Sequence, residues 1–217
     1  MASRETDRRV LMISLRKQSF FDDMYGSLLA SLNSKANLRR VDHPDEAIHL
    51  LSSQPSAVLV TDEALSLGEN QGVWEAVLQY VRNGGTCVVM GHFSGFTKPL
   101  DYKPFFAKAG LPWDSGSYHR TTLVLNREAL SNDKAVRLAP RYSQKALFVK
   151  NVAPQDSWYI TDDASHTQSH VFAPKSANIS GETAVAFASV GNGKLGYLGD
   201  VNAEEESDAV ILAMCGI

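Results

Sequence analysis

Short apolar runs alternate with amphipathic segments over the N-terminal part of the chain. Four runs have the length and composition of buried strands: RRVLMISL (8–15), NLRRVDH (37–43), AVLVTDEA (57–64) and TCVVMG (86–91). The segments between them have apolar residues at helical spacing and predict helices at 19–35, 44–54 and 70–85. This alternation predicts a mostly parallel sheet with helices on both faces.

The pattern changes after about residue 112. Strand-like segments there follow one another through polar loops rather than through helices: 117–126, 144–152, 157–160 and 169–174. We expect an antiparallel β extension or insertion at about 112–175, packed on the main sheet. The chain then continues into two strands around Gly191-Asn192-Gly193, a strong hairpin signal, and into a final helix that starts near 202–204.

Length and charge narrow the class of protein. A chain of 217 residues that is 44% hydrophobic fits one domain, 1–217, better than two. The net charge is −3 and the sequence pI is about 6.1, so there is no basic field to hold nucleic acid. The charged start lacks a signal-peptide core, and no apolar run approaches a membrane span. We therefore expect a cytoplasmic protein without nucleic-acid or membrane partners.

Cysteine and histidine usage gives no sign of a metal or cofactor. Cys87 and Cys215 fall inside apolar segments, which is ordinary core use rather than disulfide formation. His166 and His170 have a spacing that binds metals on a helix, but their surroundings predict loop and strand, and no third ligand is evident. We expect neither a metal nor a cofactor.

Ligands of parallel sheets collect beyond the carboxyl ends of the strands, near the point where strand order reverses. That rule selects residues 14–17, 61–63 and 91–95. The last of these belongs to VVMGHFSGF (88–96), which has the Gly-x-Nuc-x-Gly spacing of a nucleophile elbow. Phe93 stands at the nucleophile position, and Ser94 follows one place late.

Two segments and their order resemble the class I glutamine amidotransferase-like superfamily. AVLVTDEA, a helix and TCVVMGHFSGF resemble the strand, helix and elbow strand of that family, and GKLGYLGDVNAEEES resembles its strand that runs into a His-Pro-Glu segment. The resemblance covers about 8–98 and 181–217. It implies an α/β, flavodoxin-like three-layer sandwich with a mostly parallel sheet, to which the antiparallel extension, the C-terminal hairpin and the helix are added.

The family's catalytic residues are mostly replaced. In working amidotransferases of this type the elbow carries a cysteine, and the late segment supplies a histidine and a glutamate. Here Phe93 and Asn202 hold the first two positions, and only Glu204 keeps its type. Neither a phenyl ring nor an amide performs nucleophilic or acid–base chemistry, so glutaminase activity is not expected. The resemblance places the chain among divergent relatives such as ThuA-like or non-catalytic members. Because relatives of this fold commonly dimerise, we also expect a homodimer.

Three functions remain open at this stage: one is an interaction or structural module in which the sheet edge and the 112–175 segment form a dimer surface, and the other two concern the elbow. Of these two, the first is binding of a small polar ligand, or dimerisation, through the degenerate elbow site. The second is a serine hydrolase in which Ser94 acts with His92, His119 or His170, and Asp200 or Glu204 orients the histidine. A structural reading competes with both, because Ser94 is suited to cap the turn that follows it and Asp200 and Asn202 are suited to cap the final helix.

The candidate residues follow from these arguments. For catalysis they are Ser94, His92, Asp200 and Glu204. For ligand binding they are Gly91, Phe93, Gly95, Arg16, Asp62, His119, Arg120 and Asn202. Arg16 follows the first strand and is suited to attract an anionic group. His119 and Arg120 fall on opposite faces of a predicted strand, so one of them faces solvent or a cleft.

Overall fold

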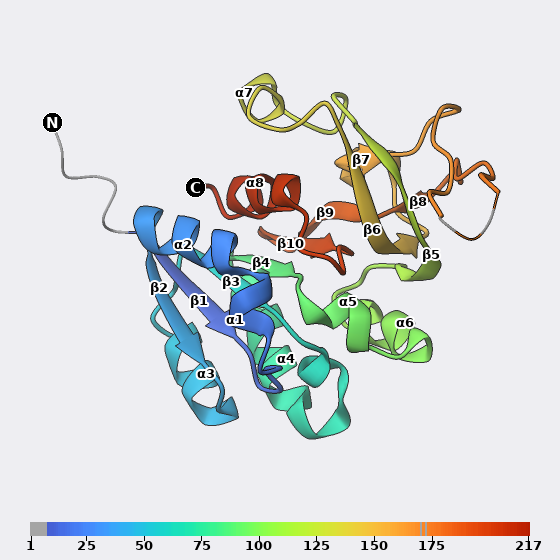
Figure 1. Cartoon of the computed structure of the whole chain (residues 1–217). Coiled ribbons are helices and arrows are strands. Elements are labelled where there is room, and N and C mark those ends of the chain that lie inside the picture. The colour runs from blue at the N-terminus through green and yellow to red at the C-terminus, as the bar shows by residue number, and fades with distance from the viewer. Residues whose placement is uncertain (1–7, 170, 172) are drawn as a thin grey trace, which may run out of the picture.

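The main sheet is mostly parallel and central. The computed structural model describes residues 8–169, 171 and 173–217 (Figure 1). Its main sheet has the strand order β2-β1-β3-β4-β10-β9. The strands are β1 (Arg9–Ile13), β2 (Asn37–Val41), β3 (Ala57–Val60), β4 (Thr86–Val89), β9 (Val185–Val190) and β10 (Gly193–Leu198). All neighbours pair in parallel except β9, which is antiparallel to β10. This is the flavodoxin-like order, 2-1-3-4-5, with β10 as its fifth strand.

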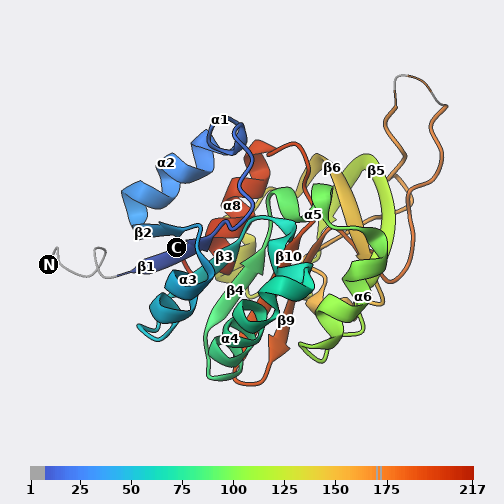
Figure 2. The ribbon, with the colours of Figure 1, turned by 90° about the horizontal axis from the view of Figure 1, so that it is seen from below.

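Helices cover both faces of this sheet (Figure 2). The helices are α1 (Phe21–Met24), α2 (Gly26–Lys35), α3 (Pro44–Leu51), α4 (Gln71–Arg82), α5 (His92–Phe96), α6 (Pro99–Ala107), α7 (Asn132–Ala135) and α8 (Glu205–Met214). In β1, Val10 and Met12 belong to a core shared with α1, α2 and α8, whereas Leu11 and Ile13 belong to a core shared with α3, α4 and α6. The apolar runs are therefore buried on both sides, as parallel strands require.

A second sheet is wholly antiparallel and has the order β7-β5-β6-β8. Its strands are β5 (Asp114–Leu125), β6 (Arg141–Lys150), β7 (Tyr159–Ile160) and β8 (Glu182–Thr183). The expected α/β fold with an antiparallel extension and a C-terminal hairpin is thus confirmed. The expected strand at 169–174 is not present among its described residues; residues 170 and 172 lie outside them.

Helix boundaries differ from expectation in a few places. The helix expected at 19–35 is divided at Tyr25 into α1 and α2, and the final helix begins at Glu205. Short 3-10 helices occur at Glu63–Ser66, Gly68–Asn70 and Pro154–Asp156. In the described ranges, no helix combines the length and the hydropathy that crossing a bilayer requires.

Residues 199–201, which we call the joint segment, connect the two sheets. The Leu147 amide donates to the Gly199 carbonyl oxygen at 3.0 Å, and the Val201 amide donates to the Lys145 carbonyl oxygen at 3.0 Å. A Cβ atom at Gly199 would lie 2.0 Å from the Leu147 carbonyl oxygen. Only glycine therefore allows β6 to approach the end of β10 this closely.

Candidate functional site

The turn after β4 has the strained geometry of an elbow. Gly91 has φ 68° and ψ −133°, and a Cβ atom there would lie 2.9 Å from the Thr61 carbonyl oxygen. The His92 amide donates to the same oxygen at 2.8 Å, and α5 begins at His92. Gly91 is thus required by the close approach of two strand ends, and the turn resembles a strand-to-helix elbow in shape.

The carboxyl ends of β1, β3 and β4 meet at this turn. The Ser14 and Thr61 hydroxyls are 2.7 Å apart. The Asp62 carboxylate accepts from the amides of Arg16 at 2.9 Å and Ala64 at 3.1 Å. Burial raises the pKa of Asp62, and these two hydrogen bonds oppose that shift. Asp62 therefore fixes the two loops, while the Arg16 side chain is about half exposed and pairs with Glu63.

Phe93, at the nucleophile position, is entirely buried. Its ring centroid lies 4.9 Å from that of Phe105 and 5.5 Å from that of Tyr102. The side chain points into the core between the sheet and α6 and offers no surface to a ligand in this conformation. Its role in the structure is packing.

Ser94 is held by backbone carbonyls. Its Oγ is 3.3 Å from the Gly91 carbonyl oxygen and 3.2 Å from the Asp200 carbonyl oxygen, and it donates to both. No hydrogen bond joins Ser94 to a histidine of the described ranges. The contacts match the structural reading, in which the hydroxyl ties the elbow turn to the joint segment.

His92 occupies an aromatic cage. Its side chain is 5% exposed and its ring centroid lies 4.9–5.8 Å from those of four rings: Phe20, Phe21, Tyr25 and Phe96. Neither ring nitrogen has a hydrogen-bond partner within the described part of the chain. Burial lowers the pKa of His92, and the nearby Glu63 carboxylate partly opposes this. His92 is therefore a neutral, buried imidazole at neutral pH.

Asp200 organises the start of α8. Its Oδ1 accepts from the Asn202 amide at 2.8 Å, and its Oδ2 accepts from the Glu204 amide at 2.8 Å and from the Ser207 hydroxyl. Burial raises the pKa of this carboxyl, and the three hydrogen bonds oppose the shift. Asp200 thereby satisfies backbone donors that precede and begin the helix.

Arg120 on β5 joins the second sheet to the loop before α8. Its Nη2 donates to Glu204 Oε1, and its Nη1 donates to the Ser143 hydroxyl at 3.2 Å. With the Asn202 amide oxygen facing the guanidinium, that oxygen also accepts from Nη2 at 2.7 Å. The positions that resemble a former histidine and glutamate are thus bound to an arginine instead.

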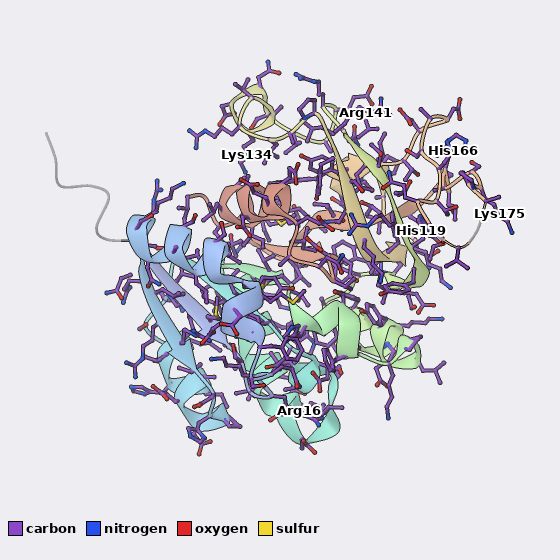
Figure 3. All side chains as sticks on the ribbon, viewed as in Figure 1. Arg16, His119, Lys134, Arg141, His166 and Lys175 are labelled. Carbon is purple, nitrogen blue, oxygen red and sulfur yellow. The ribbon has the colours of Figure 1, made fainter. Side chains whose placement is uncertain are left out.

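The polar face of β5 and β6 lines a cavity of about 1100 Å³, which we call the β5–β6 cavity. Its lining comprises Tyr118, His119, Arg120, Thr122, Lys145, Ala164, His166, Thr167, Gln168, Ser169, Ala173, Pro174, Lys175 and Asn202. Figure 3 shows that His166 and Lys175 belong to the loop that extends beside β5, on which His119 lies. The loop is fixed by hydrogen bonds from the Gln168 amide to the Arg120 carbonyl oxygen and from Gln168 Nε2 to the Thr122 hydroxyl.

The structure divides the residues selected from the sequence into two groups. His119, Arg120 and Asn202 line the β5–β6 cavity, and Glu204 adjoins it through Arg120. The remaining candidates lie beyond the carboxyl ends of the strands: Arg16 after β1, Asp62 after β3, Gly91 and the α5 residues His92, Phe93, Ser94 and Gly95 after β4, and Asp200 after β10. Figure 3 shows Arg16 in a different part of the molecule from His119. The joint segment links the two groups through the contact between Ser94 and Asp200.

Sequence reasoning missed Lys145 and Gln168 as cavity residues. Lys145 lies in QKALFVK, where two polar residues precede four apolar ones, so no alternation indicates which way its side chain faces. Gln168 carries no signal either, because its position depends on how the loop folds back onto β5.

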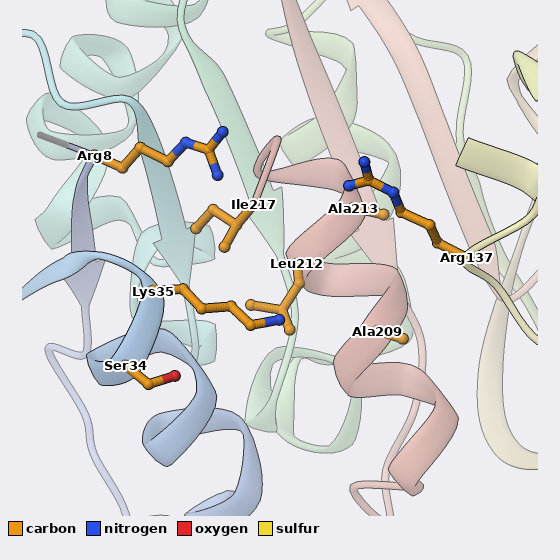
Figure 4. A pocket seen from close by; sticks show the side chains of 8 residues that line it. All are labelled: Arg8, Ser34, Lys35, Arg137, Ala209, Leu212, Ala213 and Ile217. Atoms are coloured by element: carbon orange, nitrogen blue, oxygen red, sulfur yellow. The ribbon is translucent and has the colours of Figure 1, made fainter. Parts of the chain in front are cut away.

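Two further cavities contain none of the residues selected from the sequence. One, of about 440 Å³, is lined by Arg8, Ser34, Lys35, Arg137, Ala209, Leu212, Ala213 and Ile217 (Figure 4). The other, of about 410 Å³, is lined by residues of β1 and β2, among them Arg9 and Asn37, and by the segment around Ser53 and Pro55. Among the residues described here, no group of three or more histidine, cysteine, aspartate or glutamate side chains is arranged to hold a metal ion.

Comparison with solved structures identifies the fold. No family model matches the chain, and no curated protein matches its sequence. A putative ThuA-like protein from Bacteroides uniformis is similar, with a TM-score of 0.61 at 11% identity over 95% of this chain and 88% of that one. A second putative ThuA-like protein, from Parabacteroides merdae, gives a TM-score of 0.52 at 12% identity, over 97% of this chain and 89% of that one.

A longer protein contains a similar unit. The β-galactosidase from Bacillus circulans sp. alkalophilus gives a TM-score of 0.59 at 13% identity over 96% of this chain, but over 30% of its own length. At such low identities these likenesses show the fold alone. The chain has the fold of these putative ThuA-like proteins.

Proposed function

We propose that this chain, built on the class I glutamine amidotransferase-like fold, binds a small polar ligand in the β5–β6 cavity and has no glutaminase activity. The observation that carries the proposal is the cavity itself, which includes Arg120 and Asn202 in its lining. Its volume of about 1100 Å³ is at the upper end of what small-molecule sites enclose.

The lining contains polar groups that can orient a polar ligand. Hydroxyl, amide, imidazole and cationic groups converge on the space from β5, β6 and the loop at 164–175. Some of them are already fixed by hydrogen bonds, such as the 3.0 Å bond from Gln168 Nε2 to the Thr122 hydroxyl. Polar groups that are held in place before binding lose little conformational entropy when a ligand arrives.

The chemistry of the elbow argues against the family's reaction. Phe93 has no nucleophilic atom and is buried, and the Asn202 amide is bound to Arg120. Glutamine hydrolysis by this family's route needs a thiolate and a base at these two positions. A ligand bound nearby is therefore not attacked by a residue at the elbow.

A cavity-filling variant tests the binding proposal. We expect Ala164→Trp to fill the β5–β6 cavity, because Ala164 is exposed and lines it. Ala107→Trp, at an exposed position of α6, is the matched control. A metabolite screen by thermal shift, followed by calorimetry, should find a compound that binds the wild type and Ala107→Trp but not Ala164→Trp. A screen without hits, or a hit that Ala164→Trp still binds, contradicts the proposal.

Self-association through the elbow region is a second candidate function. The observation in its favour is an apolar patch over His92, where Phe20 is 47% exposed and Phe96 is 45% exposed. Light scattering after gel filtration should then report a dimer for the wild type and a monomer for Phe96→Ser. Phe96→Tyr, which keeps the ring, is the control. A monomeric wild type at high concentration rules out this role.

A further inference from the structure

Two cations face each other across β5 and β6. Arg120 and Lys145 are direct cross-strand partners in the antiparallel register, and both line the β5–β6 cavity. Like charges in this arrangement repel each other and destabilise the strand pair. The repulsion between these two side chains is unfavourable, and a negatively charged group beside them would reduce it.

Only one of the two cations has a carboxylate partner. Glu204 pairs with Arg120, with their side chains 22% and 28% exposed. Lys145 forms no ion pair with any carboxylate in the described part of the chain; its Nζ lies 5.5 Å from the centroid of the Tyr118 ring. That contact stabilises the ammonium group but leaves its positive charge uncompensated.

The charged residues named in the cavity lining are all positive. Arg120, Lys145 and Lys175 are among the lining residues, and no aspartate or glutamate is. The Glu204 carboxylate, which adjoins the cavity, is already bound to Arg120. The cavity therefore carries a positive excess, which attracts anions.

His119 has a buried ring nitrogen. His119 lines the cavity and stacks on Phe148, with ring centroids 4.7 Å apart. Its Nε2 is buried and has no partner among the residues that the structure describes. This nitrogen has no exposed surface, so it is not available to a ligand in the cavity, and the charged side chains alone indicate an anion.

We propose that the ligand of the β5–β6 cavity is a small polar molecule that carries a carboxylate or phosphate group, and that Lys145 is the principal contact of this anion. The inference rests on the proposed binding function and narrows it to a chemical class. Arg120, held by Glu204 and Ser143, supplies a fixed second cation behind Lys145.

A matched series of probes tests the charge requirement. Glucose, gluconate, glucose 6-phosphate and inorganic phosphate are titrated into the full chain by calorimetry. We expect gluconate or glucose 6-phosphate to bind about tenfold or more tightly than glucose, because hydrogen bonds to charged groups are the stronger kind. Comparison of gluconate with the two phosphates shows which anion the site prefers. Binding should weaken as the salt concentration rises.

Two lysine variants on the same strand locate the anion. Lys145→Gln should weaken binding of the charged probes about tenfold or more and leave glucose binding unchanged. Lys150→Gln is the control, since Lys150 lies on β6 outside the cavity lining and pairs with Asp114 at 3.5 Å. Circular dichroism and thermal melting establish that both variants are folded.

The outcomes separate this inference from the binding function itself. Equal affinity for glucose and its charged analogues, or equal affinity of Lys145→Gln and Lys150→Gln for the anions, overturns the anion proposal. A compound that Ala164→Trp fails to bind still supports the cavity as a binding site in that case. If none of the four probes binds, the anion proposal is wrong. The metabolite screen then shows whether the cavity binds a neutral ligand instead.

Discussion

At the scale of single residues, His92 is a polar group buried in an aromatic part of the core. It lies among aromatic rings, and both of its ring nitrogens are buried and unpartnered within the described part of the chain. An unsatisfied buried polar atom costs about 1–3 kcal/mol. The histidine therefore lowers stability relative to an apolar ring of similar shape.

We expect His92→Phe to raise the free energy of unfolding by about 1 kcal/mol at neutral pH. The gain should grow as the pH falls below about 6.5, because burial lowers the pKa of His92 in the folded protein and protons bind the unfolded chain preferentially. With respect to His92, the wild type is thus most stable above about pH 6.5, where His92 is neutral in the folded and the unfolded state. Below that pH it loses stability, because the unfolded chain takes up a proton that the folded protein does not. Urea unfolding between pH 7 and pH 5 measures both effects.

The exposed His49 provides the comparison for this prediction. His49→Phe, on the outer surface of α3, should change neither the stability nor its pH dependence appreciably. If His92→Phe follows the same pH curve as the wild type, the lowered pKa of His92 is not a source of acid sensitivity.

Ser94 separates the structural and hydrolytic readings of the elbow. We expect Ser94→Ala to lower stability by about 1 kcal/mol, because the Gly91 and Asp200 carbonyl oxygens lose a donor. A fluorophosphonate probe should label the wild type no more than it labels this variant. Labelling of the wild type that disappears in Ser94→Ala would instead establish the hydrolase.

At the scale of elements, the contact between β6 and the end of β10 depends on one glycine. A Cβ atom at Gly199 would overlap a backbone oxygen of β6. We expect Gly199→Ala to lower stability by about 3 kcal/mol or more, since a backbone atom cannot move aside without breaking the strand.

Gly95→Ala is the matched substitution in α5. A Cβ atom there meets nothing within 4 Å, so the change should be neutral or stabilising by up to about 1 kcal/mol. Denaturant unfolding of the two variants tests the contact between the sheets. Similar stabilities for both would mean that the sheets tolerate separation at this point.

The sequence predicted most of the elements because their signals are local. The run VLMI in β1 is apolar at every position, which is what a strand buried on both faces requires. The register of β5 and β6 could not be predicted in the same way. It shifts between Ser115 and Tyr118, and that irregularity decides which residue of β6 faces Arg120. The charge pair in the cavity therefore became visible only in three dimensions.

The sequence predicted only part of the candidate site, because only some of its features depend on residues adjacent in sequence. Spacing identified the turn at Gly91, since the glycine and the preceding apolar run are adjacent in sequence. The direction of the Phe93 side chain depends on α6, which packs against it. The cavity depends on the loop at 164–175, whose residues have no periodicity from which a position could be inferred.

At the scale of the whole molecule, ligand binding and the connection between the sheets share the same backbone. Residues 199–201 bind β6 through main-chain hydrogen bonds, and Asn202 directly after them lines the cavity. We expect a ligand of the cavity to slow hydrogen exchange at the amides of Leu147 and Val201. Exchange in β1 and β2, which lie away from the cavity, should not respond; an equal response in both regions contradicts the local effect.

In this proposal, hydrogen exchange in the joint segment and in the adjoining part of β6 indicates whether a ligand occupies the cavity. Binding energy gained at Asn202 is linked thermodynamically to the opening of the two sheets, because opening removes the wall against which the ligand rests. Conversely, a substitution that loosens the joint, such as Gly199→Ala, should weaken affinity without touching any group that contacts the ligand. If the cavity binds a ligand as proposed, the affinity then depends partly on the stability of the contact between the two sheets.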